Sequence, residues 1–286
     1  MRTYLECIPC FFEQAIESVQ LITDNEIIHK ELVDDVAKLI PEFSLYSTPP
    51  EMAYKISKIV KARLGDRDLY KQIKENSNKM ALELYPKLKK KVSESNDSLL
   101  AAVEIAIAGN VIDYGAKSTL DIDKEIEQLF REKFYDAGKT IFEYEGFVKD
   151  LKKTKQVLYL ADNAGEVVFD RVLIEEFCYE KDVIYAVRDK PIINDALMKD
   201  AYDCGIDKIA KVISSGVESP GTILRYCSKE FIKIFENAEF IISKGQGNYE
   251  ALSDIRKGIY FLFKVKCPVI ARHAGAEVRD VVLLKG

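Results

Sequence analysis

The second half of the sequence alternates short apolar runs with amphipathic stretches, and this alternation limits the fold more than any other feature. The apolar runs are rich in β-branched residues and tyrosine, which predicts strands, and the stretches between them have helical spacing. Strands and helices in alternation predict βαβ units and a mostly parallel sheet. The predicted strands are residues 156–161, 183–188, 211–214, 240–243 and 265–271, and the predicted helices lie near 166–179, 194–204, 221–235 and 248–258.

The first half, up to about residue 145, has helical apolar spacing almost throughout. Thr48 is a predicted N-cap with Pro49 and Pro50 in the first turn, and the apolar run 99–108 predicts a buried helix that ends at Gly109. The fold class we expect is α/β, a Rossmann-like and mostly parallel sheet flanked by helices, with an all-helical N-terminal region. We assign 1–150 to that helical region, which caps the site, and 151–286 to an α/β domain that binds metal and phosphate.

Composition excludes several classes of function. The net charge of −5, from 42 basic and 47 acidic side chains, gives no general field for nucleic acid or an anionic membrane. No apolar run is long enough for a membrane span, and no secretory signal is visible, so a cytoplasmic protein is expected. Of the six cysteines only Cys7 and Cys10 are paired in sequence, so neither structural zinc nor a disulfide framework is expected.

Polar residues follow each predicted strand, where the carboxyl ends of a parallel sheet meet and ligands usually bind. Five consecutive strand ends therefore bring carboxylates, carboxamides, cations and glycines to one edge. The segments are 162–166 (DNAGE), 188–191 with 194–195, 214–216 (SSG), 244–250 (KGQGNYE) and 272–275 (RHAG).

The residue types at this edge favour a divalent cation and a phosphate. Asp162, Asn163 and Asp195 offer the oxygen donors that hard cations prefer. Lys244 offers positive charge, and the helix starts near residues 165 and 247 offer backbone N–H groups. Taken alone, Asp162 and Asn163 are more typical of a helix cap, and the same alternative holds for Asp195. The joint arrangement outweighs these separate readings.

No other catalytic motif fits: G-x-G-x-x-G, the P-loop and G-x-S-x-G are all missing from the sequence. Two alternatives stay open. A glycine-bearing loop after the first strand, with an acidic residue after the second, also allows an S-adenosylmethionine-dependent methyltransferase. A non-catalytic module that binds a sugar phosphate or nucleotide is the other.

The motifs together resemble a known family. They are Cys7-Ile8-Pro9-Cys10, Gly109-Asn110-Val111-Ile112-Asp113, Asp162-Asn163-Ala164-Gly165-Glu166, Asn194-Asp195 and Lys244-Gly245-Gln246-Gly247-Asn248-Tyr249-Glu250. In this order they are similar to the domain-of-unknown-function-89 family of metal-dependent damage-control phosphatases, in its stand-alone prokaryotic branch. The resemblance implies a phosphatase supported by Mn²⁺, Ni²⁺, Co²⁺ or Mg²⁺, with ligands at Asp162, Asn163 and Asp195 and a phosphate contact at Lys244. It implies small phosphorylated metabolites, often damaged or side-product sugar phosphates, as substrates.

The resulting hypothesis is hydrolysis of phosphate monoesters by a water molecule that the metal activates. Asp162 itself is the alternative nucleophile, disfavoured because a metal ligand is a poorer one. The predicted catalytic residues are Asp162, Lys244 and Glu250. The predicted substrate-binding residues are Asn110, Asp113, Gly165, Glu166, Arg188, Ser214, Gly245 and Asn248.

Three points stay open at this stage. Gly109 or Asn110 could end its helix in the left-handed conformation. Alternatively, Asn110 and Asp113 could reach over the strand ends to bind substrate hydroxyls or to orient the groups around the metal. Cys7 and Cys10 could be a reduced pair at a helix start, or could lie near the pocket or respond to redox state. The oligomeric state, the physiological metal and the substrate are not indicated by the sequence.

Overall fold

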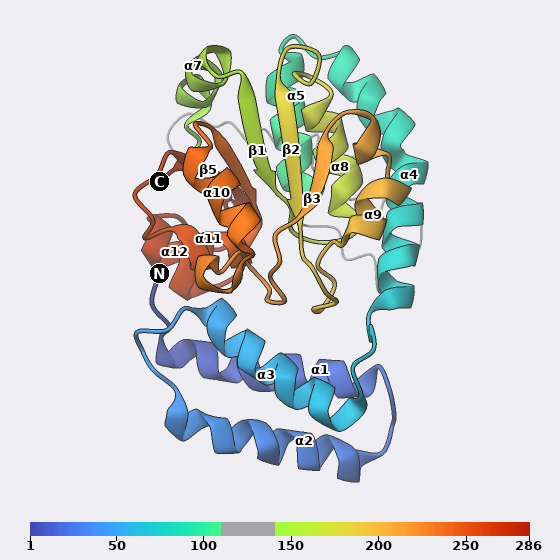
Figure 1. The fold of residues 1–286 in the computed structure, drawn as a ribbon, viewed down its shortest axis with the longest axis vertical. Helices are drawn as coiled ribbons and strands as arrows, with labels where there is room; N and C mark the ends of the chain where they lie inside the picture. The colour runs from blue at the N-terminus through green and yellow to red at the C-terminus, as the bar shows by residue number, and fades with distance from the viewer. Residues whose placement is uncertain (110–140) are drawn as a thin grey trace.

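A computed structural model describes residues 1–109 and 141–286 of the chain (Figure 1). The N-terminal helices are α1 (Ile8–Gln20), α2 (Glu26–Leu39), α3 (Pro49–Leu64), α4 (Lys71–Ser93) and α5 (Ser98–Ala108). The later helices are α7 (Tyr144–Lys153), α8 (Glu166–Ile174), α9 (Met198–Asp203), α10 (Lys229–Asn237), α11 (Gln246–Leu252) and α12 (Pro268–Ala274). The strands are β1 (Gln156–Leu160), β2 (Asp182–Val187), β3 (Lys211–Ser214), β4 (Ile241–Lys244), β5 (Ile259–Lys264) and β6 (Val281–Lys285).

The strands form a six-stranded sheet in the order β3-β2-β1-β4-β5-β6. Strands β1 to β5 are parallel to one another, and β6 pairs antiparallel with β5. The expected α/β fold with a mostly parallel sheet is confirmed. The first four predicted strands agree with β1 to β4 to within one residue at each end.

The fifth predicted strand is wrong. Residues 265–271 lead into and form most of α12, while the strand next to β4 is Ile259–Lys264. Pro268 occupies the first position of α12, where its missing N–H costs nothing, so this apolar run is a buried helix start. Periodicity cannot separate a short buried helix from a buried strand. Strand β6 was not predicted.

Helices cover both faces of the sheet (Figure 1). Helices α4, α5 and α8 pack on one face with a core that includes Tyr159 and Tyr185, and α10, α11 and α12 pack on the other with Phe261. Helix α5 is almost fully buried, as predicted. It ends at Gly109, whose φ of −52° is right-handed, and Asn110, the other residue for which a left-handed conformation was considered, lies outside the described residues. A Cβ at Gly109 would lie 2.8 Å from Cγ of Phe169, and glycine thus permits close packing of α5 on α8.

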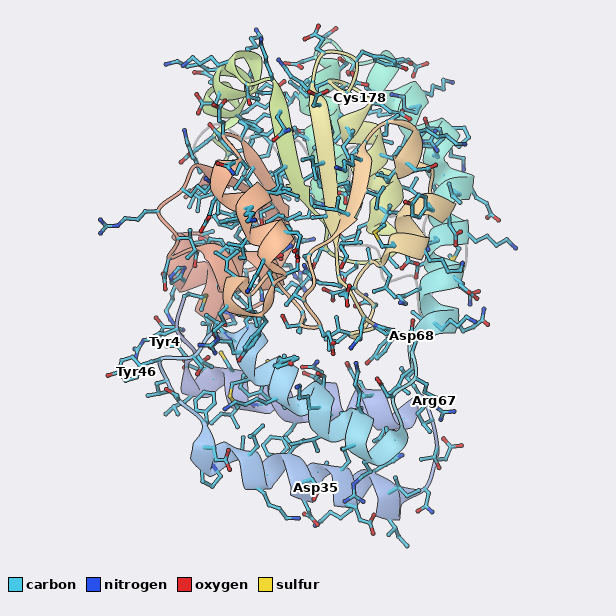
Figure 2. The ribbon with its side chains drawn as sticks, viewed as in Figure 1. Tyr4, Asp35, Tyr46, Arg67, Asp68 and Cys178 are labelled. Carbon is cyan, nitrogen blue, oxygen red and sulfur yellow. The ribbon has the colours of Figure 1, made fainter. Side chains whose placement is uncertain are left out.

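Helices α1, α2 and α3 form a separate layer with its own core of Phe11, Val36, Met52 and Ile56. In Figure 1 this layer lies below the sheet and its flanking helices, and α3 contacts α11. Helix α3 starts as predicted, because the Glu51 carboxylate accepts a 2.9 Å hydrogen bond from the N–H of Thr48. Figure 2 shows Asp35 and Tyr46 on this layer and Arg67 with Asp68 where the chain passes to α4. The helical N-terminal region therefore serves in two places, as cap (α1–α3) and as sheet cover (α4 and α5).

Candidate active site

Strands β1 and β4 are adjacent, and the chain leaves them in opposite directions along the sheet. Ligands of open α/β sheets bind at such a switch point. Asp162 follows β1 and Gly245 follows β4, with Gly245 at φ 78°. A Cβ at Gly245 would lie 1.8 Å from Oδ2 of Asp162, so only glycine leaves space for this carboxylate.

The loop after β2 brings Asp195 to the same place. An isolated antiparallel bridge joins Asn163 to Asp195, and the N–H of Ala196 donates to the carbonyl of Asp162 at 2.8 Å. Nδ2 of Asn163 donates to Asp162 Oδ2 at 3.1 Å and to Glu166 Oε1 at 2.8 Å. In this orientation the amide nitrogen of Asn163 binds carboxylates, and its side-chain carbonyl oxygen is the atom that could bind a cation.

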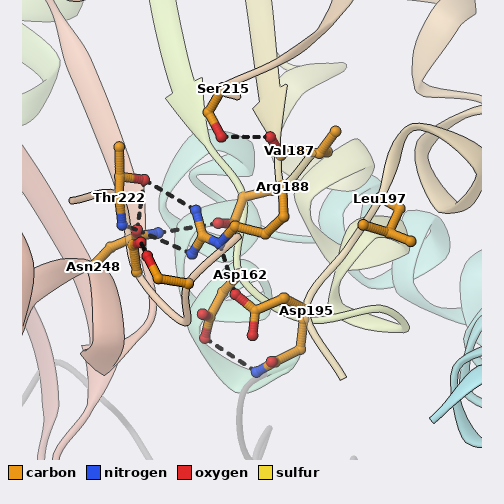
Figure 3. Close-up of polar contacts among 12 residues, drawn as sticks. Asp162, Val187, Arg188, Asp195, Leu197, Ser215, Thr222 and Asn248 are labelled. Carbon is orange, nitrogen blue, oxygen red and sulfur yellow. Dashed lines mark hydrogen bonds and ion pairs between the residues drawn. The ribbon is translucent and has the colours of Figure 1, made fainter. Parts of the chain in front are cut away.

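Asp195 is held by Arg188, which is itself 1% exposed. Nε of Arg188 donates to Asp195 Oδ2 at 2.7 Å, and the two other nitrogens donate to Thr222 Oγ1 at 3.0 Å and Asn248 Oδ1 at 3.1 Å. Figure 3 shows this arginine with Thr222 and Asn248 on one side and the carboxylates of Asp195 and Asp162 on the other. All three guanidinium nitrogens are therefore engaged in fixing the loops around Asp195.

Asn248 ties the ends of β1 and β4 together. Its Nδ2 donates to the carbonyls of Ala161 at 3.0 Å and Lys244 at 2.8 Å, and its Oδ1 accepts from Arg188 and Thr222. The hydrogen-bonding capacity of this buried carboxamide is thus used within the protein. The predicted contacts of Arg188 and Asn248 with substrate stay predictions, and both side chains have evident positioning roles.

Lys244 points into the interior on the α8 side of the sheet. Its Nζ lies 2.8 Å from Asp170 Oδ1 and 3.2 Å from Glu166 Oε2, and no part of the side chain is exposed. Asp170 also accepts hydrogen bonds from the hydroxyls of Tyr159 at 2.7 Å and Tyr185 at 2.8 Å. In this structure Lys244 and Glu166 pair with each other. Their predicted contacts with substrate stay predictions.

The carboxylates at this edge are crowded. Burial, followed by the charges of Glu166 and Asp195, raises the pKa of Asp162 to about 8. Burial also raises the pKa of Asp195, and the Arg188 charge opposes this shift. The nearby cation Lys266 acts in the opposite sense on Asp162 and favours its charged form. Concentrated negative charge in a buried setting is an environment that a bound cation would stabilise.

Helix α4 positions the loop after β1. This role of α4 was not predicted from the sequence. Oδ1 of Asn78 accepts from the N–H of Gly165 at 2.7 Å, and its Nδ2 donates to Asp200 at 2.7 Å. Gly165 has a φ of 80°, and its N–H, predicted as a phosphate donor, is engaged by Asn78 here. Lys74, one turn earlier in α4, forms a 2.6 Å ion pair with Asp68.

A cavity of about 550 Å³ lies between this edge and the α1–α3 layer. Asp162, Asn163, Asp195 and Glu250 line it among the predicted site residues. The cap contributes Cys7, Cys10, Gln14, Pro49, Pro50 and Ala53, and the segment after β5 contributes Lys266, Cys267, Pro268 and Val269.

Comparisons with known proteins identify the family of this chain. Residues 3–282 match the family described as the damage-control phosphatase ARMT1-like domain. The chain belongs to this family. The resemblance inferred from the sequence is therefore confirmed.

Relatives match along nearly their whole length. A protein of Methanocaldococcus jannaschii, described as uncharacterized, is 40% identical over 98% of this chain and 94% of its own. A damage-control phosphatase of Pyrococcus horikoshii is 35% identical over 95% and 94%, and one of Archaeoglobus fulgidus is 35% identical over 96% of each. The crystal structure of a DUF89 family protein from Pyrococcus horikoshii superposes with a TM-score of 0.91 at 32% identity, covering 100% of this chain and 99% of that one.

Other predicted residues lie away from the cavity or outside the described part of the chain. Ser214 donates to Asp189 at 2.6 Å at the end of β3 and does not line the cavity. Arg272 and His273, predicted to follow a strand, lie in α12 instead, and Nδ1 of His273 is 2.8 Å from the Tyr249 hydroxyl. Asn110 and Asp113 lie outside the described residues.

The donors fit a hard divalent cation in chemical type. Asp162, Asn163 and Asp195 supply two carboxylates and a carboxamide, which are oxygen ligands. Within residues 1–109 and 141–286, no three His, Cys, Asp or Glu side chains are grouped so as to hold a metal, so a cation held by Asp162 and Asp195 would need the carboxamide of Asn163 as a third ligand. Over the same residues, no helix is long and apolar enough to cross a membrane.

Proposed function

We propose that this chain is a metal-dependent phosphatase that hydrolyses phosphate monoesters of small metabolites, with Mn²⁺, Ni²⁺, Co²⁺ or Mg²⁺ as its cofactor. The observation that carries the proposal is the meeting of Asp162, Asn163 and Asp195 on the wall of one cavity at the switch point of the sheet. Membership of the family, and relatives named damage-control phosphatases, support the reaction class.

In the proposed site, Asp162, Asn163 and Asp195 would hold the cation through their side-chain oxygens. A divalent cation there supplies charge withdrawal from phosphate oxygens and activation of water. Arg188 keeps Asp195 in place through the 2.7 Å bond to Oδ2. Gly245 keeps the space for Asp162 open, because any side chain at that position would overlap the carboxylate.

Glu250 is the proposed acid or base. It lines the cavity, and burial raises its pKa from 4.5 to about 7, which suits proton transfer near neutral pH. Its Oε1 accepts a 2.9 Å hydrogen bond from Gln246, which fixes the carboxyl. The proposed step is transfer of a proton between Glu250 and the attacking water or the leaving alcohol oxygen. Asp162 is committed as a ligand, so water is the favoured nucleophile.

Lys266 and Lys244 have different proposed roles. Lys266 is exposed on the cavity wall and would attract an anionic substrate. Lys244 neutralises Glu166 and Asp170 beneath the site, and its proposed contact with phosphate would require exchange of the 3.2 Å Glu166 partner. The substrate class we propose is small phosphorylated metabolites, including damaged or side-product sugar phosphates.

The test is phosphate release from sugar phosphates and p-nitrophenyl phosphate after chelation, with Mg²⁺, Mn²⁺, Co²⁺ or Ni²⁺ added singly. Asp162→Asn keeps the side-chain volume and removes the charge, so we expect a loss of more than about 100-fold in kcat/KM. Asp189→Asn is the matched control, since Asp189 is exposed just after β2 and accepts a hydrogen bond from Ser214.

Each result separates the alternatives. Release by wild type and Asp189→Asn, but not by Asp162→Asn, would support the proposal. Thermal protection by phosphate esters without turnover under any metal would favour a binding module instead. Micromolar binding of S-adenosylmethionine without metal would favour a methyltransferase.

A further inference from the structure

Three of the chain's six cysteines line the cavity. Cys7 is the N-cap of α1, Cys10 lies in its first turn, and Cys267 comes from the segment before α12, more than 250 residues away. Cys178 lies at the opposite end of the molecule from α1–α3 (Figure 2), and neither Cys204 nor Cys227 lines the cavity. All six are free thiols, and Cys10 is exposed. Three thiols are thus gathered on the wall of the cavity that holds the candidate site.

Cys7 and Cys10 already have a backbone suited to a disulfide. Cys7 is in the right-handed helical region at φ −78° and ψ −18°, and Ile8 continues at φ −58° and ψ −47°. Helical residues three apart have Cα atoms about 5 Å apart. Disulfides join Cα atoms about 4.4 to 6.8 Å apart, so this pair can close without movement of α1 against the rest of the cap.

The thiols lie beside the proposed acid or base. Sγ of Cys267 is 4.0 Å from Nε2 of Gln246, and the same nitrogen donates to Glu250 Oε1 at 2.9 Å. The charge of Glu250 also acts on Cys7 and Cys10. A change at these sulfurs therefore takes place on the wall that faces Glu250.

We propose that Cys7 and Cys10 are a reversible dithiol–disulfide site, oxidised by a low-molecular-weight disulfide, whose oxidation reshapes the cavity and weakens substrate binding. The effect on activity rests on the proposed phosphatase function. The disulfide itself does not.

The chemistry is two exchanges. The thiolate of exposed Cys10 attacks one sulfur of the small disulfide, forms a mixed disulfide and expels one small thiolate. The thiolate of Cys7 then attacks the Cys10 sulfur, forms the Cys7–Cys10 bond and expels the second small thiolate. The two cysteines together lose two electrons and two protons, and the small disulfide is reduced to two thiols.

The surroundings make this exchange slow near neutral pH. Burial raises the pKa of both Cys7 and Cys10, and the neighbouring Cys267 thiol and Glu250 act in the same direction. Because the thiolate is the attacking species, a raised pKa lowers the fraction of each thiol that can react near neutral pH.

The experiment treats the full-length chain with oxidised glutathione without oxygen and maps disulfides by mass spectrometry of peptides made under acid. We expect a Cys7–Cys10 bond in wild type and in Cys178→Ser, and none after dithiothreitol or in Cys7→Ser. Pairing of Cys267 with either residue, or no bond at all, would overturn the proposal.

The second readout is kcat/KM of each variant, oxidised against reduced, with the proposed metal added. We expect about a threefold or larger fall in wild type and Cys178→Ser, mostly in KM, reversed by dithiothreitol. In Cys10→Ser, which lacks the thiol that attacks the small disulfide first, the oxidised sample should have the same KM as the reduced sample of the same variant. An unchanged KM in protein that holds the bond, or an equal loss in Cys10→Ser, would contradict the proposal. A reduced wild type without activity would count against the proposed function, while the peptide map would still decide the disulfide.

Discussion

At the scale of single residues, Asp162 shows how backbone conformation makes room for a functional side chain. Its carboxylate occupies the space that a Cβ on Gly245 would take, since such a Cβ would lie 1.8 Å from Oδ2 of Asp162. Such a close approach is possible only where the facing residue has no side chain. The order of strands β1 and β4 in the sheet makes the two residues neighbours.

Gly245→Ala should therefore displace Asp162 and abolish most activity. The backbone strain at φ 78° should also cost about 1–3 kcal/mol of unfolding free energy. Gly65→Ala is the matched control, because Gly65 has nearly the same backbone (φ 92°, ψ 154°) and a Cβ added there would meet nothing within 4 Å. Kinetics and urea denaturation would check this, and equal activities of the two variants would contradict it.

Glu250 should make stability depend on pH. The folded chain holds the Glu250 proton up to a pKa of about 7, whereas the unfolded chain loses it near 4.5. Unfolding between these values releases a proton, so a rise in pH favours the unfolded state. From pH 5 to 8, wild type should lose on the order of 2 kcal/mol more unfolding free energy than Glu250→Gln does.

Urea denaturation at both pH values would measure this difference. Glu94→Gln, at the exposed end of α4, should follow wild type. A Glu250→Gln protein whose stability falls as steeply as that of wild type would rule out the raised pKa.

The roles of some site residues could be predicted from the sequence, and the roles of others could not. Asp162, Asn163 and Asp195 follow neighbouring strands, so parallel topology alone predicted that they meet. Arg188 and Asn248 are 60 positions apart, and their mutual bond depends on which strands pair and which loops approach. The sequence showed that these side chains are polar, but it did not show whether they contact a ligand or another residue.

At the scale of elements, α4 does more than cover the sheet. Asn78 reaches from it to the N–H of Gly165, 87 positions later, and to Asp200 before the end of α9. This long-range bond had no signal in local periodicity, which predicted only that α4 is a helix. Likewise, the true neighbour of β4 was missed because 265–271 is as apolar as a strand.

Asn78→Ala should leave two buried partners without their hydrogen bonds and cost about 1–3 kcal/mol of unfolding free energy. Activity should fall too, because the Gly165 loop carries Asn163. Asn76→Ala removes a similar side chain from the exposed face of the same helix, where it bonds Gln72, and should have little effect. Urea denaturation and phosphate release compare the pair, and equal stability of the two variants would refute this role of Asn78.

At the scale of the whole molecule, the α1–α3 layer closes the cavity from the side opposite the sheet. It is joined to the rest by α3 against α11 and by ion pairs such as Arg225 with Glu51 at 2.7 Å. The sequence predicted a helical cap and an α/β core from their different periodicities. It did not predict that α4 and α5 leave the cap and join the core, because a helix pattern does not specify its partner.

The cation that Asp162, Asn163 and Asp195 are proposed to hold underlies every step of the proposed reaction. The most direct test of this site is Mn²⁺ titration followed by electron paramagnetic resonance, with wild type, Asp195→Asn and Asp189→Asn compared. We predict that wild type and Asp189→Asn bind Mn²⁺ alike and that Asp195→Asn weakens binding by more than about 100-fold. Equal Mn²⁺ affinity in all three proteins would contradict the account.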